Sequence, residues 1–143
     1  MMNNELFLIA NRDFETTGNE YDPHILESLP LIYRENGSAT RQLMENFIEM
    51  SGLIVSKKIE LTSNEAVKQA VLAGLGCSIM PLIGVKNELL NGSLKIVPVK
   101  GLPIVTVWNL VWMKQKKFSP VATAFRHYIM LHHEQIMKKH FSI

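Results

Sequence analysis

The sequence predicts an α/β domain in which a central, mostly parallel sheet is flanked by helices. Short apolar runs alternate with longer stretches in which apolar residues recur at helical spacing. Loops of a few residues join these stretches, which is typical of strands and helices packed in layers. The chain has 143 residues, 47% of them hydrophobic and 20% charged, which suits one globular domain with a sizeable core.

The first half of the chain carries two predicted strands and one long helix. Gly52 closes that helix, whose apolar positions include Met44, Phe47 and Ile48. The predicted elements are, in order, a buried strand at Leu6–Ala10, a polar loop at 11–22, a helical turn at His24–Leu29, a strand at Leu31–Arg34 and a helix over 38–50.

The middle of the chain repeats this alternation. Thr62 precedes Glu65 by three residues, as in a capping box, and predicts the start of a helix that ends at Gly74. Pro81 suits the first position of a following helix. The predicted elements here are a strand at Lys58–Leu61, the helix after Thr62, a strand at Cys77–Met80, a helix over 82–90 and a strand at Leu94–Val99.

The last part is predicted to hold one long strand and one long helix. The strand covers Val105–Met113 and carries both tryptophans. Ser119 followed by Pro120 is an N-cap with proline at the first helical position, and it opens a helix to about Lys139. The apolar stripe of this helix consists of Val121, Phe125, Tyr128, Ile129, His132 and Ile136.

The turn at Asn36–Arg41 joins a strand to a helix and contains a Gly-Ser-x-Thr sequence. The first N–H groups of a helix lack internal partners and lie at the positive end of its dipole, so this turn suits a carboxylate, phosphate or sulfate. The alternative is that Ser38 only caps its own helix. Ligands of parallel sheets bind beyond the carboxyl ends of the strands, so the turns at Glu35–Thr40, Thr62–Glu65 and Met80–Pro81 converge if their strands are neighbours.

Composition excludes several classes of function. A formal net charge of +2 is too small for a nucleic-acid-binding face. The single cysteine excludes a disulfide framework and a cysteine metal cluster. The amino-terminal residues do not read as a secretory signal, and no apolar stretch is long enough to cross a bilayer. We therefore expect a cytoplasmic domain without a membrane partner.

No set of residues forms a credible catalytic or metal-binding constellation. Cys77 lies in an apolar segment with no histidine near it in sequence, which favours a buried, inert thiol. His132, His133 and His140 lack the carboxylate-and-histidine spacing of a metal site. The sequence contains neither a Gly-x-Ser-x-Gly elbow nor a glycine-rich nucleotide loop. We expect no enzyme activity, no cofactor and no metal.

Four segments, in this order, closely resemble the effector-binding domain of LysR-type transcriptional regulators. The resemblance covers nearly the whole chain, and its strength lies in the matching order and intervals of the segments. They are Tyr33-Arg34-Glu35-Asn36-Gly37-Ser38-Ala39-Thr40-Arg41, Thr62-Ser63-Asn64-Glu65-Ala66-Val67-Lys68-Gln69-Ala70-Val71, Ala73-Gly74-Leu75-Gly76-Cys77-Ser78-Ile79-Met80-Pro81 and Ser119-Pro120-Val121-Ala122-Thr123-Ala124-Phe125.

The resemblance implies an α/β fold like that of type 2 periplasmic binding proteins, built from two subdomains with the effector between them. Residues 1–105 would be the second subdomain, and residues 106–143 the return crossover strand and terminal helix of an incomplete first subdomain. Members of this family bind DNA through an amino-terminal winged helix-turn-helix domain, which is not recognisable in this chain. We therefore expect a ligand-sensing fragment that reaches DNA only through that absent domain.

The resemblance also implies which residues contact the effector, and because the polar groups offered are hydroxyls and helix N-termini, we expect that effector to be a small anionic metabolite. Gly37, Ser38 and Thr40 belong to the family's turn, with Asn36 beside them, and the strand-end argument adds Asn64 and Met80. Arg41 either faces the ligand or braces the turn, and we favour bracing. The unpartnered apolar surface around Phe125, Ile129 and Trp112 predicts a homodimer or larger oligomer. The alternative function is a free-standing solute-binding protein of the periplasmic type.

Overall fold

A computed structural model describes residues 2–140 of the chain. The chain divides into two compact units. One unit is Asn4–Thr106; the other combines the residues up to Asn3 with those from Val107 onward. The predicted subdomains, residues 1–105 and 106–143, include residues 1 and 141–143, which lie outside the described part of the chain.

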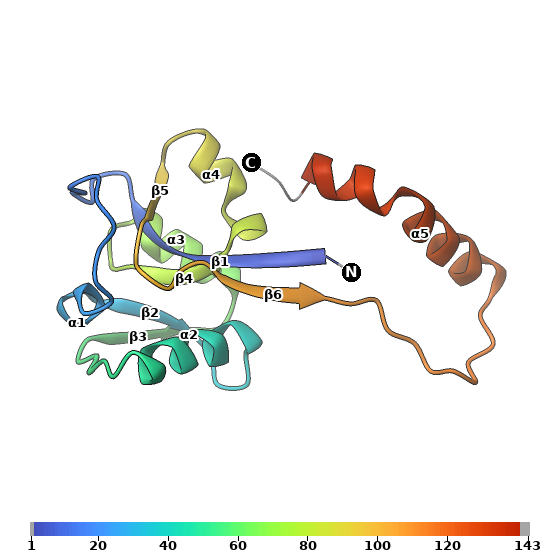
Figure 1. Cartoon of the computed structure of the whole chain (residues 1–143), viewed down its shortest axis with the longest axis horizontal. Coiled ribbons are helices and arrows are strands. Elements are labelled where there is room, and N and C mark those ends of the chain that lie inside the picture. Colours follow the sequence, from blue (N-terminus) through green and yellow to red (C-terminus); the bar gives the residue numbers. More distant parts are fainter. Residues whose placement is uncertain (1, 141–143) are drawn as a thin grey trace. The chain divides into compact units, whose positions relative to one another are not determined.

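The larger unit alternates strands and helices along the chain (Figure 1). Its strands are β1 (Met2–Asn11, which starts in the other unit), β2 (Leu31–Arg34), β3 (Lys58–Leu61), β4 (Ser78–Pro81), β5 (Leu94–Val97) and β6 (Ile104–Trp108, which ends in the other unit). Its helices are α1 (Ile25–Ser28), α2 (Ala39–Met50), α3 (Asn64–Leu72), the 3₁₀ turn η1 (Leu82–Gly84) and α4 (Lys86–Leu90).

Four of the strands run in the same direction, and β1 runs against them. β2 pairs with β3 in parallel, and Leu31 forms a parallel bridge with Cys77 just before β4. The buried Ser78 hydroxyl donates a hydrogen bond to the Ile32 carbonyl at 2.6 Å, which joins β2 to β4. β1 lies between β4 and β5 and is antiparallel to both, so these two strands share one direction. The predicted α/β fold is therefore confirmed: these four strands share one direction, β2 and β3 form a parallel two-stranded sheet, and β1 is the reversed strand in a second sheet with β4, β5 and β6.

Helices pack on both faces of β2 because its residues Leu31–Tyr33 are buried on both sides. Tyr33 of β2 packs with Met44 of α2 in one core cluster. Its neighbour in the strand, Ile32, packs with Val67 of α3 in a second cluster. Successive residues of a strand point to opposite faces, so α2 and α3 cover opposite faces of β2 (Figure 1).

Helices α2, α3 and α4 end in the same way. Each is followed by a glycine with positive φ, at Gly52, Gly74 and Gly92. After α3, the Gly74 N–H donates to the Val71 carbonyl at 2.9 Å, and the next N–H donates to the Ala70 carbonyl at 3.1 Å. This pair of bonds is a Schellman motif, which satisfies carbonyls at the helix end. The predicted helix ends at Gly52 and Gly74 are confirmed.

The predicted helix over 82–90 is wrong in its first half. Pro81 does not open a helix but closes β4, and the short η1 turn follows it. Val85 then adopts φ −130° and ψ 5°, which is not helical and separates η1 from α4. Only Lys86–Leu90 is α-helical.

The predicted strands at Leu94–Val99 and Val105–Met113 are both shorter than expected. β5 ends at Val97, although Val99 still bridges to Tyr21 in parallel. β6 pairs with β1 and ends at Trp108. Within residues 2–140, no strand pairs with residues 109–118, so their backbone is not held in a ladder.

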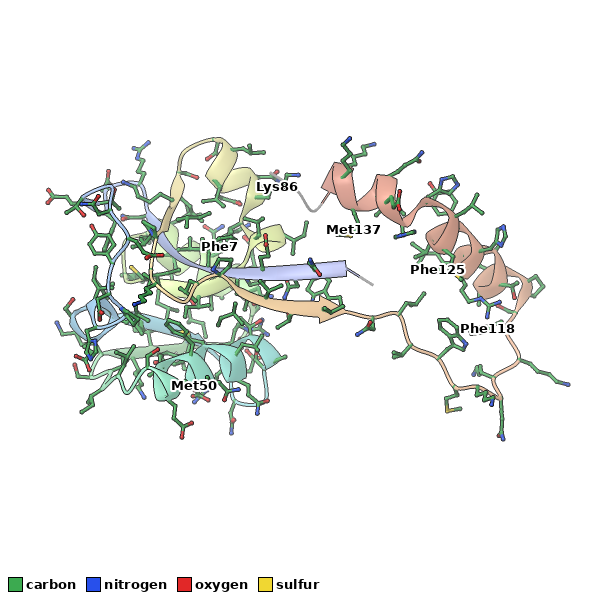
Figure 2. The ribbon with its side chains drawn as sticks, in the orientation of Figure 1. Phe7, Met50, Lys86, Phe118, Phe125 and Met137 are labelled. Atoms are coloured by element: carbon green, nitrogen blue, oxygen red, sulfur yellow. The ribbon has the colours of Figure 1, made fainter. Side chains whose placement is uncertain are left out.

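The smaller unit contains the predicted terminal helix, α5 (Pro120–His140). The Ser119 hydroxyl accepts a hydrogen bond from the Ala122 N–H at 3.2 Å, as an N-cap does. The Arg126 guanidinium lies over the rings of Trp112 and Phe118, 5.4 and 5.1 Å from their centroids, and so ties the preceding segment to α5. Phe125, one residue earlier, remains 59% exposed. Figure 2 labels Phe118 and Phe125.

Candidate functional site

The carboxyl ends of β3, β2 and β4 lie at the same edge of the sheet. These three strands are adjacent and parallel, because β2 pairs with β3 and bridges to the start of β4. The turns that follow them therefore share that edge, as the strand-end argument requires. We call this edge the rim; it comprises Arg34–Arg41, Ser63–Asn64 and the end of β4.

The turn after β2 forms a small hollow on the rim. Gly37 at its centre has φ 90°, a conformation that glycine adopts without strain. Ser38 follows as the N-cap of α2, and its hydroxyl accepts from the Arg41 N–H at 3.5 Å, the long limit for such a bond. The hollow has a volume of about 180 Å³, and its lining residues are Asn36, Gly37, Ser38, Arg41, Gln42 and Glu45.

Arg41 holds the turn in place. Its guanidinium donates to the Glu45 carboxylate at 2.8 Å and to the Arg34 carbonyl at 3.2 Å. The same guanidinium also donates to Glu60 of β3. Hydrogen bonds to Glu45 and then Glu60 raise the pKa of Arg41 above its usual value. Arg41 thus connects the first turn of α2 to β2 and β3, which is the bracing role that the sequence favours.

The second rim segment begins α3, but not at the predicted residue. Ser63, not Thr62, is the N-cap: its backbone is extended, and its hydroxyl accepts from the Ala66 N–H at 3.0 Å. Glu65 does not form the reciprocal half of a capping box. Its carboxylate accepts from the Gln69 amide at 2.9 Å and pairs with Lys68 at 3.0 Å instead. The capping-box prediction for Thr62 is therefore wrong by one residue.

Arg34 connects the two rim segments. It is the last residue of β2, and its guanidinium donates to the side-chain oxygen of Asn64, the first residue of α3. It also holds both carboxylate oxygens of Glu35, from Nε at 2.7 Å and from the second terminal nitrogen at 2.8 Å. This bidentate contact lowers the pKa of Glu35 and raises that of Arg34. Arg34 is 18% exposed in its side chain and Glu35 34%.

Sequence reasoning missed Arg34 as a rim residue. The available signal was its position, since it ends a strand whose following turn was already a candidate site. Its contact with Asn64 requires the neighbouring positions of β2 and β3, which the pattern of apolar residues does not specify.

The structure brings some of the predicted contact residues together. Asn36, Gly37 and Ser38 line the hollow, and Asn64 is tied to the turn through Arg34. Thr40 is half-buried in the first turn of α2 and is not among the residues that line the hollow. Met80 is 1% exposed and packs in the core cluster below α3. The assignment of these six residues to a ligand remains a prediction.

Tyr33 lies beneath the rim in the core. The Arg41 guanidinium and the Lys58 ammonium lie 6.0 and 5.5 Å from its ring centroid. Its hydroxyl is buried and has no hydrogen-bond partner within the described residues. Burial, followed by the nearby Glu45, raises the pKa of Tyr33 to about 12, so the hydroxyl stays neutral.

Cys77 is the single cysteine of the chain. Cys77 is buried, and burial raises the pKa of its thiol to about 11. Within the described part of the chain, no three His, Cys, Asp or Glu side chains are grouped as metal ligands would be. Among residues 2–140, no helix is both long and apolar enough to span a membrane.

Comparison with known proteins yields one family. A family model described as the LysR substrate binding domain matches residues 1–132. The chain is 37% identical over 136 residues to the HTH-type transcriptional activator CmpR of Synechocystis, covering 94% of this chain and 45% of that protein. It is 38% identical over 127 residues to the RuBisCO operon transcriptional regulator of Acidithiobacillus ferrooxidans, covering 88% of this chain and 41% of that protein. The chain thus spans less than half the length of these curated relatives, which are transcriptional regulators.

Solved structures share the same fold. The Synechocystis PCC6803 CcmR regulatory domain in complex with 2-PG has a TM-score of 0.79 and 31% identity, covering 91% of this chain and 63% of that chain. The effector binding domain of QuiR in complex with shikimate has a TM-score of 0.68 at 15% identity, covering 94% of this chain and 63% of that chain. The second likeness is one of fold alone.

Proposed function

The chain belongs to the LysR substrate-binding domain family, and on this premise we propose that it is the effector-sensing part of a LysR-type transcriptional regulator. The observation that carries this proposal is the turn between β2 and α2. It presents a hollow at a helix N-terminus, and the residues that line it are Asn36, Gly37, Ser38, Arg41, Gln42 and Glu45.

The effector we propose is a small anionic metabolite. The rim offers several donors, which are backbone N–H groups, the Ser38 hydroxyl, the side-chain amides of Asn36 and Asn64, and the cation of Arg34. The carboxylates near them, Glu35 and Glu45, are already engaged by Arg34 and Arg41. Such a set of donors suits a carboxylate or phosphate far better than an amine. The complex of the related CcmR domain with 2-PG, at 31% identity, makes 2-PG the first compound to test.

The mechanism we propose is cleft closure. An effector that binds the closed arrangement better than the open one shifts the population toward it, and the change of shape is transmitted to DNA by the rest of the regulator. In this proposal residues 1–105 are the second subdomain, and residues 106–143 belong to the first. The longer protein would be a cytoplasmic homodimer that binds DNA through a winged helix-turn-helix domain.

The test is isothermal titration of the longer protein that contains this chain. We expect 2-PG or another small phosphate or carboxylate to bind, and the Ser38→Ala variant to bind it more weakly. A preference for cationic or apolar ligands would contradict the proposal. The coding sequence upstream of residue 1 supplies a second test, because the proposal requires a helix-turn-helix there.

A further inference from the structure

We propose that Asn36, which lines the hollow, is a site of spontaneous deamidation, a reaction that converts its side-chain amide to a carboxylate. The modification itself depends only on the local contacts of the turn after β2. Its consequence, weaker binding of anions at the hollow, rests on the proposed function.

The sequence Asn-Gly-Ser occurs twice in the chain and provides an internal comparison. The first copy is Asn36-Gly37-Ser38, after β2, and the second is Asn91-Gly92-Ser93, after α4. Asparagine before glycine is prone to deamidation because glycine has no side chain to shield its own backbone nitrogen. In both copies the asparagine and the glycine are exposed, so access to solvent does not distinguish them.

Deamidation needs a free backbone nitrogen and a side-chain amide that can turn toward it. The glycine nitrogen loses its proton to a base in the solvent and attacks Cγ of the asparagine. The N–Cγ bond forms, the Cγ–Nδ2 bond breaks, and the side-chain nitrogen takes up a proton and leaves as ammonia. Water then opens the cyclic imide at either of its carbonyls, which gives aspartate or its β-linked isomer. The reaction consumes water and releases ammonia, and nothing is oxidised or reduced.

Asn36 and Gly37 meet both requirements. Among residues 2–140, neither the Asn36 side chain nor the Gly37 N–H takes part in a hydrogen bond. The turn is closed around them, because the Ser38 N–H donates to the Glu35 carbonyl at 3.2 Å. The Gly37 nitrogen can therefore lose its proton, and the Asn36 amide can rotate toward it, without the loss of a hydrogen bond in the turn.

Asn91 and Gly92 are held by contacts that the first copy lacks. The Asn91 side-chain oxygen accepts from the Ser93 N–H at 3.0 Å and from the Ser93 hydroxyl at 2.6 Å. The Gly92 N–H donates to the Leu89 carbonyl at 3.3 Å, so the attacking nitrogen is engaged as well. Deamidation of Asn91 must first break these hydrogen bonds, and their free energy adds to the barrier.

Deamidation of Asn36 places a negative charge at the hollow. The amide offers two N–H donors, whereas the carboxylate that replaces it only accepts hydrogen bonds. Asn36 lies two residues before Ser38, the N-cap of α2, so the new charge stands near the helix end that attracts anions. It repels a ligand of the same sign, and the modified protein binds anions more weakly than the unmodified one.

The test incubates the complete chain at neutral pH and follows both copies by peptide mass spectrometry. Deamidation is recognised by the mass gained when the amide becomes a carboxylic acid. In the folded protein we expect Asn36 to react at least about tenfold faster than Asn91, because of the hydrogen bonds that must break at Asn91. In urea these contacts are lost from both copies of the tripeptide, so the two rates should become similar.

Two substitutions test the physical cause. Ser93→Ala removes the hydroxyl that holds the Asn91 side chain, so it should raise the rate at Asn91 severalfold and leave the rate at Asn36 unchanged. Asn36→Gln lengthens the side chain by a methylene group, which disfavours closure of the five-membered ring. It should abolish modification at position 36.

The consequence for binding is tested with inorganic phosphate at constant ionic strength, followed by NMR through the backbone amide signals of Gly37 and Ser38. Asn36→Asp reproduces the charge that deamidation adds, and we expect it to bind phosphate about fivefold more weakly than the parent. Asn91→Asp is the matched control. It adds the same charge at a residue that does not line the hollow, so it should bind phosphate as the parent does.

The two measurements separate the modification from the proposed function. Faster reaction at Asn36 than at Asn91 in the folded protein, with the difference lost in urea, supports the inference. Equal rates in the folded protein, or a difference that persists in urea, would overturn it. If Asn36 reacts as expected but phosphate shifts the amide signals of no variant, the modification site stands and the proposed anion site is refuted. If Asn36→Asp binds phosphate as tightly as the parent, the stated consequence is wrong.

Discussion

Arg41 donates a hydrogen bond from its guanidinium to the backbone carbonyl of Arg34, 3.2 Å away. This bond links the first turn of α2 to the last residue of β2 and closes the loop that contains Asn36–Ser38. The loop is thereby held at both ends, so its N–H groups are arranged before any ligand arrives. A site arranged in advance loses less entropy on binding.

Two serine N-caps on the rim should differ in their contribution to stability. The Ser63 hydroxyl accepts at 3.0 Å from its helix, whereas the Ser38 hydroxyl accepts at 3.5 Å. Ser63→Ala should lower the free energy of unfolding by about 1 kcal/mol, and Ser38→Ala by about half of that or less. Urea denaturation of both variants measures the difference. If Ser38→Ala costs as much as Ser63→Ala, Ser38 acts mainly as a cap and its role in anion binding is in doubt.

Gly76 is required by a close backbone contact. A Cβ at this position would lie 2.3 Å from the Pro30 carbonyl oxygen. Because the carbonyl oxygen belongs to the backbone and the position of a Cβ is fixed by its own backbone, the clash cannot be relieved by a side-chain rotation. We expect Gly76→Ala to lower the free energy of unfolding by roughly 3 kcal/mol.

Gly84→Ala is the control for that substitution, since a Cβ there meets nothing within 4 Å. It should be neutral or slightly stabilising, because alanine restricts the unfolded chain. Thermal unfolding of the two variants side by side checks the contrast. A Gly76→Ala protein as stable as the parent would contradict the close packing at Pro30.

Tyr33→Phe should leave stability unchanged or raise it by up to about 1 kcal/mol. The Tyr33 hydroxyl is buried without a hydrogen-bond partner among the described residues. Removing this hydroxyl therefore breaks no hydrogen bond and relieves the cost of burying it. Chemical denaturation measures the change. A loss of more than about 1 kcal/mol would mean that an ordered water satisfies the hydroxyl in solution.

Cys77 should react slowly in the folded protein. Burial raises the pKa of its thiol from 9.0 to about 11, so the protonated form is favoured in the folded state. Its contribution to stability is complete below pH 9.0 and is lost as the pH rises toward about 11. Stability of the parent should therefore fall more steeply over this range than that of Cys77→Ala. A disulfide reagent that labels Cys77 as fast at neutral pH as in urea would refute its burial.

The exposed apolar residues of α5 should cause self-association. Phe125 is 59% exposed, and Tyr128 on the same helix is 57% exposed. We expect sedimentation to show a dimer or larger species at micromolar concentration, and Phe125→Glu to shift it toward monomer. Met50→Glu is the control, because Met50 is 88% exposed at the end of α2 in the other unit. A parent chain that stays monomeric would contradict this expectation.

The strands and helices around the turn were predictable because local signals agreed with each other. The strand at Leu31–Arg34 begins with an apolar run, Leu31–Tyr33, which stops at a polar turn, and the observed bounds match. The helix after Ser38 has a capping residue, regular apolar spacing and a terminal glycine, all of which occur in the structure. Agreement among local signals is what makes such a prediction reliable.

Other features depend on contacts that local sequence does not specify. Thr62 and Ser63 both offer a capping hydroxyl, and only the backbone conformation decides that Ser63 is used. The Arg34–Asn64 contact exists because β2 and β3 are neighbours. The reversed direction of β1 is invisible to periodicity, since a buried strand has the same apolar pattern in either direction.

The position of β1 has a consequence for how the chain folds. β1 precedes the other strands of the larger unit, and its partners β4 and β5 lie far along the chain from it. Parallel pairing of β2 with β3 needs a much shorter loop, so the α2–β3–α3 region can organise early. During synthesis the apolar residues of β1 stay exposed until β4 and β5 have been made. We therefore expect insertion of β1 between β4 and β5 to be the slow step of folding and the stage at which the chain is most prone to aggregate.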